Sequence, residues 1–98
     1  MTITKTVTEN LANLALDGEL DSLASTDLET ALEECIGQNL SVCLDCAKVP
    51  FVSSAGLRVL LCAYKKIAKY GELTLVNITE DVHTIMFLSG FTKILRIK

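Results

Sequence analysis

Apolar and polar residues alternate at the N-terminal end of the chain with the two-residue period of β-strands. Residues 2–8 carry threonine at every second position, and β-branched residues are typical of strands. Lys5 falls on the face that also carries the aliphatic residues, which favours an edge strand where a lysine can reach water. Asn10 interrupts the pattern, and Leu11–Asp17 follows as a second predicted strand.

The hydrophobic period then changes to that of helices. Thr26 and Glu29 have the spacing of a capping box, which predicts a helix start there. Gly37 is expected to end this helix, whose apolar stripe comprises Leu28, Leu32, Cys35 and Ile36. Thr79 is predicted to cap a later helix with acidic residues in its first turn and with three inward residues, Val82, Ile85 and Met86.

The strongest helical pattern follows two adjacent serines. Either Ser53 or Ser54 is expected to be the N-cap, because a serine oxygen accepts from the free N–H groups of a first turn. The helix is predicted to run to about Tyr70, with Gly71 as a left-handed cap. We expect one apolar stripe to pack against a sheet, namely Leu57, Leu60, Leu61, Tyr64 and Ala68.

Three further apolar segments are short enough to be strands. They are Leu40–Cys46, Leu73–Val76 and Ile94–Ile97, and Pro50 helps to prevent the first from continuing. The order is therefore β-β-α-β-α-β-α-β, which predicts an α/β fold: a mixed sheet with helices packed mainly on one face. Ninety-eight residues suffice for one domain, predicted to span residues 1–98.

Composition and charge argue against two classes of function, nucleic-acid binding and membrane insertion. The net charge of -3 and the lack of an arginine-rich segment argue against direct nucleic-acid binding. Apolar runs stay shorter than a membrane span, so no membrane insertion is expected. The polar N-terminus lacks the apolar centre of a signal peptide, which predicts a cytoplasmic protein.

The four cysteines and the single histidine do not predict a metal or catalytic site. Cys43 and Cys46 are three residues apart in a predicted strand, so their side chains point to opposite faces and cannot share one zinc ion. All four cysteines are expected to be reduced and mostly buried. His83 is distant in sequence from the serines, and no nucleophile elbow or phosphate loop is present. We therefore expect no catalytic residue, no metal and no cofactor.

Several motifs together resemble one known family. The segment Phe51-Val-Ser-Ser-Ala-Gly-Leu-Arg-Val-Leu-Leu61 resembles the signature of the STAS domain, in its bacterial anti-sigma factor antagonist branch. Gly18-Glu-Leu-Asp21, Leu44-Asp45 and Leu88-Ser-Gly-Phe91 resemble other landmarks of that family in order and spacing. The resemblance covers nearly the whole chain.

The resemblance also implies a site. It places the family's phosphorylatable serine at Ser54, whereas Ser53 stands where the best-studied pattern has aspartate. A helix start suits a phosphate, because free N–H groups and the positive end of the helix dipole face it. The implied partner-binding residues are Asp21, Asp45, Ser53, Ser54, Ala55, Gly56 and Arg58. Asp21 and Asp45 are expected to gather near the serines from neighbouring strand ends. Arg58, one turn after Ser54, can pair with a phosphate or remain a solvated helix residue.

By resemblance, the chain is an anti-sigma factor antagonist that works as a phosphorylation-switched binding module. Its partner would be an anti-sigma factor that is also a serine kinase. Phosphorylation of Ser54 would release the antagonist, and a serine phosphatase would restore it. The chain would then be a substrate and not an enzyme, with ATP belonging to the kinase. The alternative is a STAS scaffold or accessory subunit of a transport system with no phosphorylation switch.

Overall fold

Strict alternation of buried and exposed residues along β2 (Leu11–Asp17) defines two faces of a sheet in the computed structural model, which describes residues 1–98. Ala12, Leu14 and Leu16 are buried, whereas the residues between them are exposed. This pattern is typical of a sheet with one face on the core and one in water. The predicted strand matches the observed one at both ends.

Five strands form one sheet in the order β1-β2-β3-β4-β5. β1 (Thr2–Thr8) is an edge strand, as Lys5 predicted, and it is antiparallel to β2. The other three strands, β3 (Ser41–Lys48), β4 (Leu73–Val76) and β5 (Arg96–Ile97), each run parallel to the preceding strand. The predicted mixed sheet and the predicted element order are confirmed.

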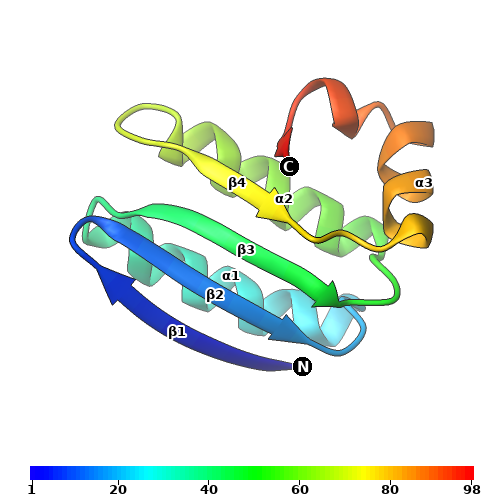
Figure 1. Cartoon of the computed structure of the whole chain (residues 1–98), viewed down its shortest axis with the longest axis horizontal. Coiled ribbons are helices and arrows are strands. Elements are labelled where there is room, and N and C mark those ends of the chain that lie inside the picture. The colour runs from blue at the N-terminus through cyan, green and yellow to red at the C-terminus, as the bar shows by residue number, and fades with distance from the viewer.

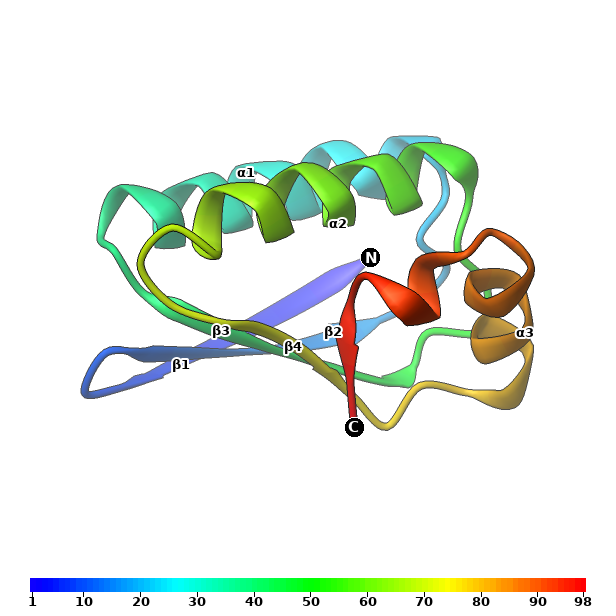
Figure 2. The same ribbon diagram turned by 90° about the horizontal axis from the view of Figure 1, so that it is seen from above.

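Helices connect the parallel strands. Figure 2 shows α1 (Ser22–Gly37) and α2 (Ser54–Ile67) side by side on one face of the sheet. The third helix, α3 (Glu80–Leu88), lies at the end of the sheet where β3 and β4 finish (Figure 1), and Thr79 caps it as predicted. The helices thus lie mainly on one face, and the other face of the sheet stays open. No helix has both the length and the apolar character needed to cross a membrane.

The start of α1 differs from the prediction. Asp21, and not Thr26, is the N-cap, and its Oδ1 accepts from the backbone N–H of Ala24 at 2.8 Å. Thr26 lies inside the helix, so the capping box with Glu29 does not form. The reason is that the buried stripe extends back to Ala24, and an aspartate with extended backbone is a better cap ahead of it.

The end of α2 also differs. The helix ends at Ile67, earlier than Tyr70. Its buried residues are Gly56, Leu57, Leu60, Ala63 and Ile67, so Leu57 and Leu60 are confirmed. Tyr64 is half-buried against the core, whereas Leu61 is half-buried outside it and Ala68 is exposed. The inward stripe is therefore rotated toward Ala63 and Ile67.

Gly71 has a role other than the predicted left-handed cap, because its φ is not positive. A Cβ on this residue would collide with Oγ of Ser41. That same Ser41 oxygen accepts from the backbone N–H of Glu72 at 3.1 Å. Gly71 thus leaves room for the Ser41 hydroxyl in the position from which it accepts the Glu72 N–H.

The C-terminal strand is shorter than the predicted Ile94–Ile97. A 3₁₀ turn, Phe91–Lys93, precedes it, and the N–H groups of Ile94 and Leu95 both donate to the Phe91 carbonyl. These bonds keep Ile94 in the turn and leave it exposed, while Leu95 enters the core. Only Arg96–Ile97 then pairs with β4.

All four cysteines are free thiols, but they are less uniformly buried than expected. Cys35 and Cys46 are buried, Cys43 is half-buried on the open face of the sheet, and Cys62 is exposed on α2. Burial raises the pKa of the Cys46 thiol to about 12, and the neighbouring Asp45 adds to this effect. Burial also raises the pKa of Cys35.

Candidate functional site

The starts of α1 and α2 are tied together by backbone hydrogen bonds. Leu20 and Val52 form an isolated parallel bridge between the segments that precede the two helices. The N–H of Leu20 donates to the Phe51 carbonyl at 2.9 Å, and the N–H of Ser53 donates to the Leu20 carbonyl at 2.9 Å. These bonds place the N-termini of both helices next to each other at one end of the sheet.

The two serines have different roles at the start of α2. Oγ of Ser53 accepts from the N–H of Gly56 at 3.1 Å, and the Ser53 carbonyl accepts from Leu57 at 2.9 Å. Ser53 is therefore the N-cap, which decides between the two serines that the sequence left open. Ser54 is the first helical residue, and its side chain is exposed.

Gly56 is buried beneath this turn. A Cβ on Gly56 would lie 2.8 Å from Cγ of Leu20 and 2.9 Å from its Cδ2, both shorter than real carbon contacts. The absence of a side chain lets the first turn of α2 approach the segment before α1. The structure gives Gly56 a packing role in the serine turn, residues 53–56 at the start of α2, and its predicted contact with a partner stays a prediction.

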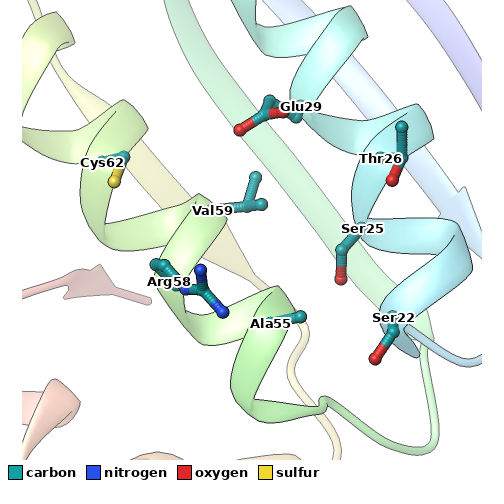
Figure 3. A pocket seen from close by; sticks show the side chains of 8 residues that line it. All are labelled: Ser22, Ser25, Thr26, Glu29, Ala55, Arg58, Val59 and Cys62. Carbon is teal, nitrogen blue, oxygen red and sulfur yellow. The ribbon is translucent and has the colours of Figure 1, made fainter.

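A groove of about 200 Å³ runs between the N-terminal halves of α1 and α2. Its lining is mostly polar and small (Figure 3) and consists of Ser22, Ser25, Thr26, Glu29, Ala55, Arg58, Val59 and Cys62. Figure 3 shows the Arg58 guanidinium directed back along α2 towards Ala55, and so towards the helix start. Two predicted site residues, Ala55 and Arg58, thus share this groove beside the serine turn.

Asp21 joins this end of the molecule as the cap of α1, and its side chain is exposed. Its main-chain carbonyl accepts from Oγ of the buried Ser25 at 2.6 Å. Through its bond to Ala24 the carboxylate has a structural function at the start of α1, directly before the groove-lining Ser22, besides any contact with a partner.

Asp45 lies elsewhere. It belongs to the residues of β3 that face away from the helices, since Leu44 and Cys46 on either side of it are buried. Its Oδ1 accepts from the N–H of Ala47 at 3.1 Å and from Nδ2 of Asn77 at 3.2 Å. The expected gathering of Asp45 with Asp21 around the serines is therefore not found, because the pleat turns Asp45 to the open face. A partner contact by Asp45 stays a prediction.

The lining of the groove limits its chemistry. It contains one carboxylate, Glu29, and one guanidinium, Arg58, but no histidine. An activated serine nucleophile needs a base within hydrogen-bond reach, and a histidine is the usual one. The arrangement instead presents an exposed hydroxyl on Ser54 at a helix start, beside an arginine, where a covalently attached anion is favoured.

Sequence reasoning missed two residues that shape this site, Leu20 and Glu29. Leu20 bridges to Val52 and packs under Gly56, whereas Glu29 faces α2 across the groove. A signal for the first was present, since Ala24 and Leu28 continue the helical stripe back towards Asp21 and Leu20. No signal in the sequence placed Glu29 in the groove beside α2, because that requires the packing of α1 on α2.

Comparisons with known proteins agree with this fold. The model of the STAS domain family matches residues 2–98. The anti-sigma F factor antagonist of Paenibacillus polymyxa is 33% identical over 85 residues, which cover 84% of this chain and 73% of that protein. A crystal structure of an anti-sigma factor antagonist from Mycobacterium paratuberculosis superimposes with a TM-score of 0.88 at 22% identity, covering 98% of this chain and 83% of that one. The Bacillus cell fate determinant SpoIIAA, solved in its phosphorylated form, gives a TM-score of 0.76 at 20% identity, covering 99% and 91%. The chain thus belongs to the STAS domain family, in its anti-sigma factor antagonist branch.

Proposed function

We propose that this protein is an anti-sigma factor antagonist whose binding is switched by phosphorylation of Ser54. In the unphosphorylated state it sequesters an anti-sigma factor that is also a serine kinase, and phosphorylation releases it. A serine phosphatase reverses the modification. The chain acts in the cytoplasm as a binding module and a kinase substrate, with no catalytic activity of its own.

The observation that carries this proposal is that the two adjacent serines have different roles, Ser53 as the N-cap and Ser54 as an exposed helical residue. Ser53 holds the first turn of α2, because its Oγ accepts from the N–H of Gly56, and its side chain is half-buried. Ser54 is exposed at the first helical position and is available to a kinase. The resemblance of residues 51–61 to the family signature supports the same residue, because it implies that Ser54 takes the place of the family's phosphorylatable serine. The Bacillus cell fate determinant SpoIIAA has itself been solved in a phosphorylated form.

Charge explains how the switch works. A phosphate adds about -1.5 to -2 charges at a position where the N–H groups of a helix start favour them, so the folded domain is not weakened. An interface built around unmodified Ser54 would instead have to bury a solvated dianion. The exposed carboxylate of Asp21 on the adjacent helix start adds repulsion. Release therefore results from exclusion of charge and not from unfolding.

Phosphopeptide mapping tests the assignment. The protein is incubated with ATP, Mg²⁺ and the purified kinase-type anti-sigma factors of its own organism. We expect one phosphate on Ser54 and none in Ser54→Ala. Ser53→Ala is the matched control, since it removes the neighbouring hydroxyl and should still be phosphorylated. Phosphate found on Ser53, or retained in Ser54→Ala, overturns the assignment.

A further inference from the structure

Arg58 is a cation without a partner in the resting protein. The two ion pairs of the structure join Lys66 to Glu33 at 2.7 Å and Arg96 to Glu72 at 3.1 Å. Arg58 therefore has no carboxylate within 4.0 Å, although Glu29 lines the same groove. Exposed ion pairs contribute little, so an arginine without a carboxylate partner is free to pair with another anion that lies within its reach.

The geometry of α2 brings Ser54 within reach of the Arg58 side chain. Ser54 and Arg58 are four residues apart in the same helix, and residues at this spacing are neighbours on one face. Helical side chains lean towards the N-terminus, which tilts Arg58 over the turn that begins at Ser54. Figure 3 shows its guanidinium pointing towards Ala55, the residue that follows Ser54 in the chain. The guanidinium fork matches the oxygens of a phosphate in a bidentate pair.

We propose that Arg58 is the intramolecular partner of phosphoserine 54: it closes over the phosphate and holds it against the start of α2. This inference rests on the proposed function, because it concerns the product of that modification. It assigns Arg58 a positioning role within the phosphorylated chain and not primarily a contact with the partner protein. The phosphorylated state then carries an ion pair that the unphosphorylated state lacks.

The test uses protein that carries phosphoserine at position 54 by genetic encoding, so it needs no kinase. Phosphorus NMR titration measures the second pKa of the phosphate. A neighbouring guanidinium favours the dianion, so Arg58→Gln should raise this pKa by about 0.5 unit relative to the parent. Arg58→Lys should recover part of the difference, because a lysine keeps the charge but not the bidentate geometry. The difference should fall towards zero at about 1 M salt, where the screening length is about 3 Å.

Lys65→Gln is the matched control. Lys65 is exposed on the same side of α2, eleven residues from Ser54, or about 16 Å along the helix axis. The Lys65→Gln variant loses one positive charge, as Arg58→Gln does, but at a distance at which the phosphate pKa should stay unchanged. The proposal is overturned if Arg58→Gln leaves that pKa unchanged, or if Lys65→Gln raises it equally. Failure of the kinase to modify Ser54 would instead contradict the proposed function, whereas the NMR titration would still test the pairing of Arg58 with the phosphate.

Discussion

Leu20 and Gly56 pack together where the starts of α1 and α2 meet, and this contact sets how closely the serine turn approaches the segment before α1. The side chain of Leu20 occupies the space that a Cβ on Gly56 would need, 2.8 Å from Cγ. The carbonyl of Leu20 also accepts from the N–H of Ser53. One residue thus supports the turn through its side chain and through its backbone.

Gly56→Ala should destabilise the protein, although alanine is the better helix former. Overpacking against Leu20 costs about 1–3 kcal/mol in the free energy of unfolding. Gly37→Ala is the matched control in α1, because no atom lies within 4 Å of the position its Cβ would take. That change should be neutral or stabilising by up to about 1 kcal/mol. Urea denaturation measures both, and a stabilising Gly56→Ala would show that the contact with Leu20 is not tight.

Replacement of the two serines should affect the free energy of unfolding differently, because only Ser53 caps α2. Ser53→Ala removes the acceptor for the N–H of Gly56 and should cost about 1 kcal/mol. Ser54→Ala removes an exposed hydroxyl and should change the free energy of unfolding by less than about 0.5 kcal/mol. Thermal melts of the two single variants test this, and equal losses would contradict the assignment of Ser53 as the cap.

Thiol chemistry should follow burial. Cys62 is exposed and should react with iodoacetamide in the native protein, whereas Cys35 and Cys46 should react only after unfolding. Mass spectrometry of tryptic peptides after short labelling identifies the modified residues. Rapid labelling of Cys46 in the folded state would mean that the strand it occupies opens far more readily than its burial predicts.

The raised pKa of Cys46 predicts the direction of a pH effect. In the unfolded chain this thiol ionises near 9, but in the folded protein its pKa is about 12. Between these values the folded state holds more protons, so its stability falls as pH rises, by up to about 1.4 kcal/mol per pH unit from this group. Cys46→Ala removes the group and should flatten the slope above pH 9. Chemical denaturation at a series of pH values compares the two slopes, and identical slopes would refute the effect.

Much of this fold could be predicted because its strands and helices carry regular patterns. The Thr79 cap of α3 was a strong local signal, and both that helix and the predicted strand Leu11–Asp17 were confirmed. The start of α1 was misplaced because the Thr26 and Glu29 spacing is a local signal, whereas the true cap at Asp21 goes with the burial of Ala24 in the core. Local propensity cannot weigh such tertiary contacts.

The site was predicted less completely than the fold. Ser54 and Arg58 could be found because they lie in one short motif. The place of Asp45 depended on which face of β3 its side chain occupies, and the strand register sends it to the open face. The collision that makes Gly56 necessary involves Leu20, a residue from another segment, so no local pattern could reveal it.

The most direct test of the central claim is calorimetric titration of the kinase-type anti-sigma factor with three forms of this protein: unmodified, phosphorylated on Ser54, and Ser54→Ala. Thermal melts of the same samples accompany the titrations. The switch predicts that the unmodified protein and Ser54→Ala bind with similar affinity. It also predicts that the phosphorylated form binds at least about tenfold more weakly, a difference of about 1.4 kcal/mol, with its melting temperature unchanged or raised. Equal affinity of the phosphorylated and unmodified forms, or a loss of binding that follows from unfolding, would contradict the account.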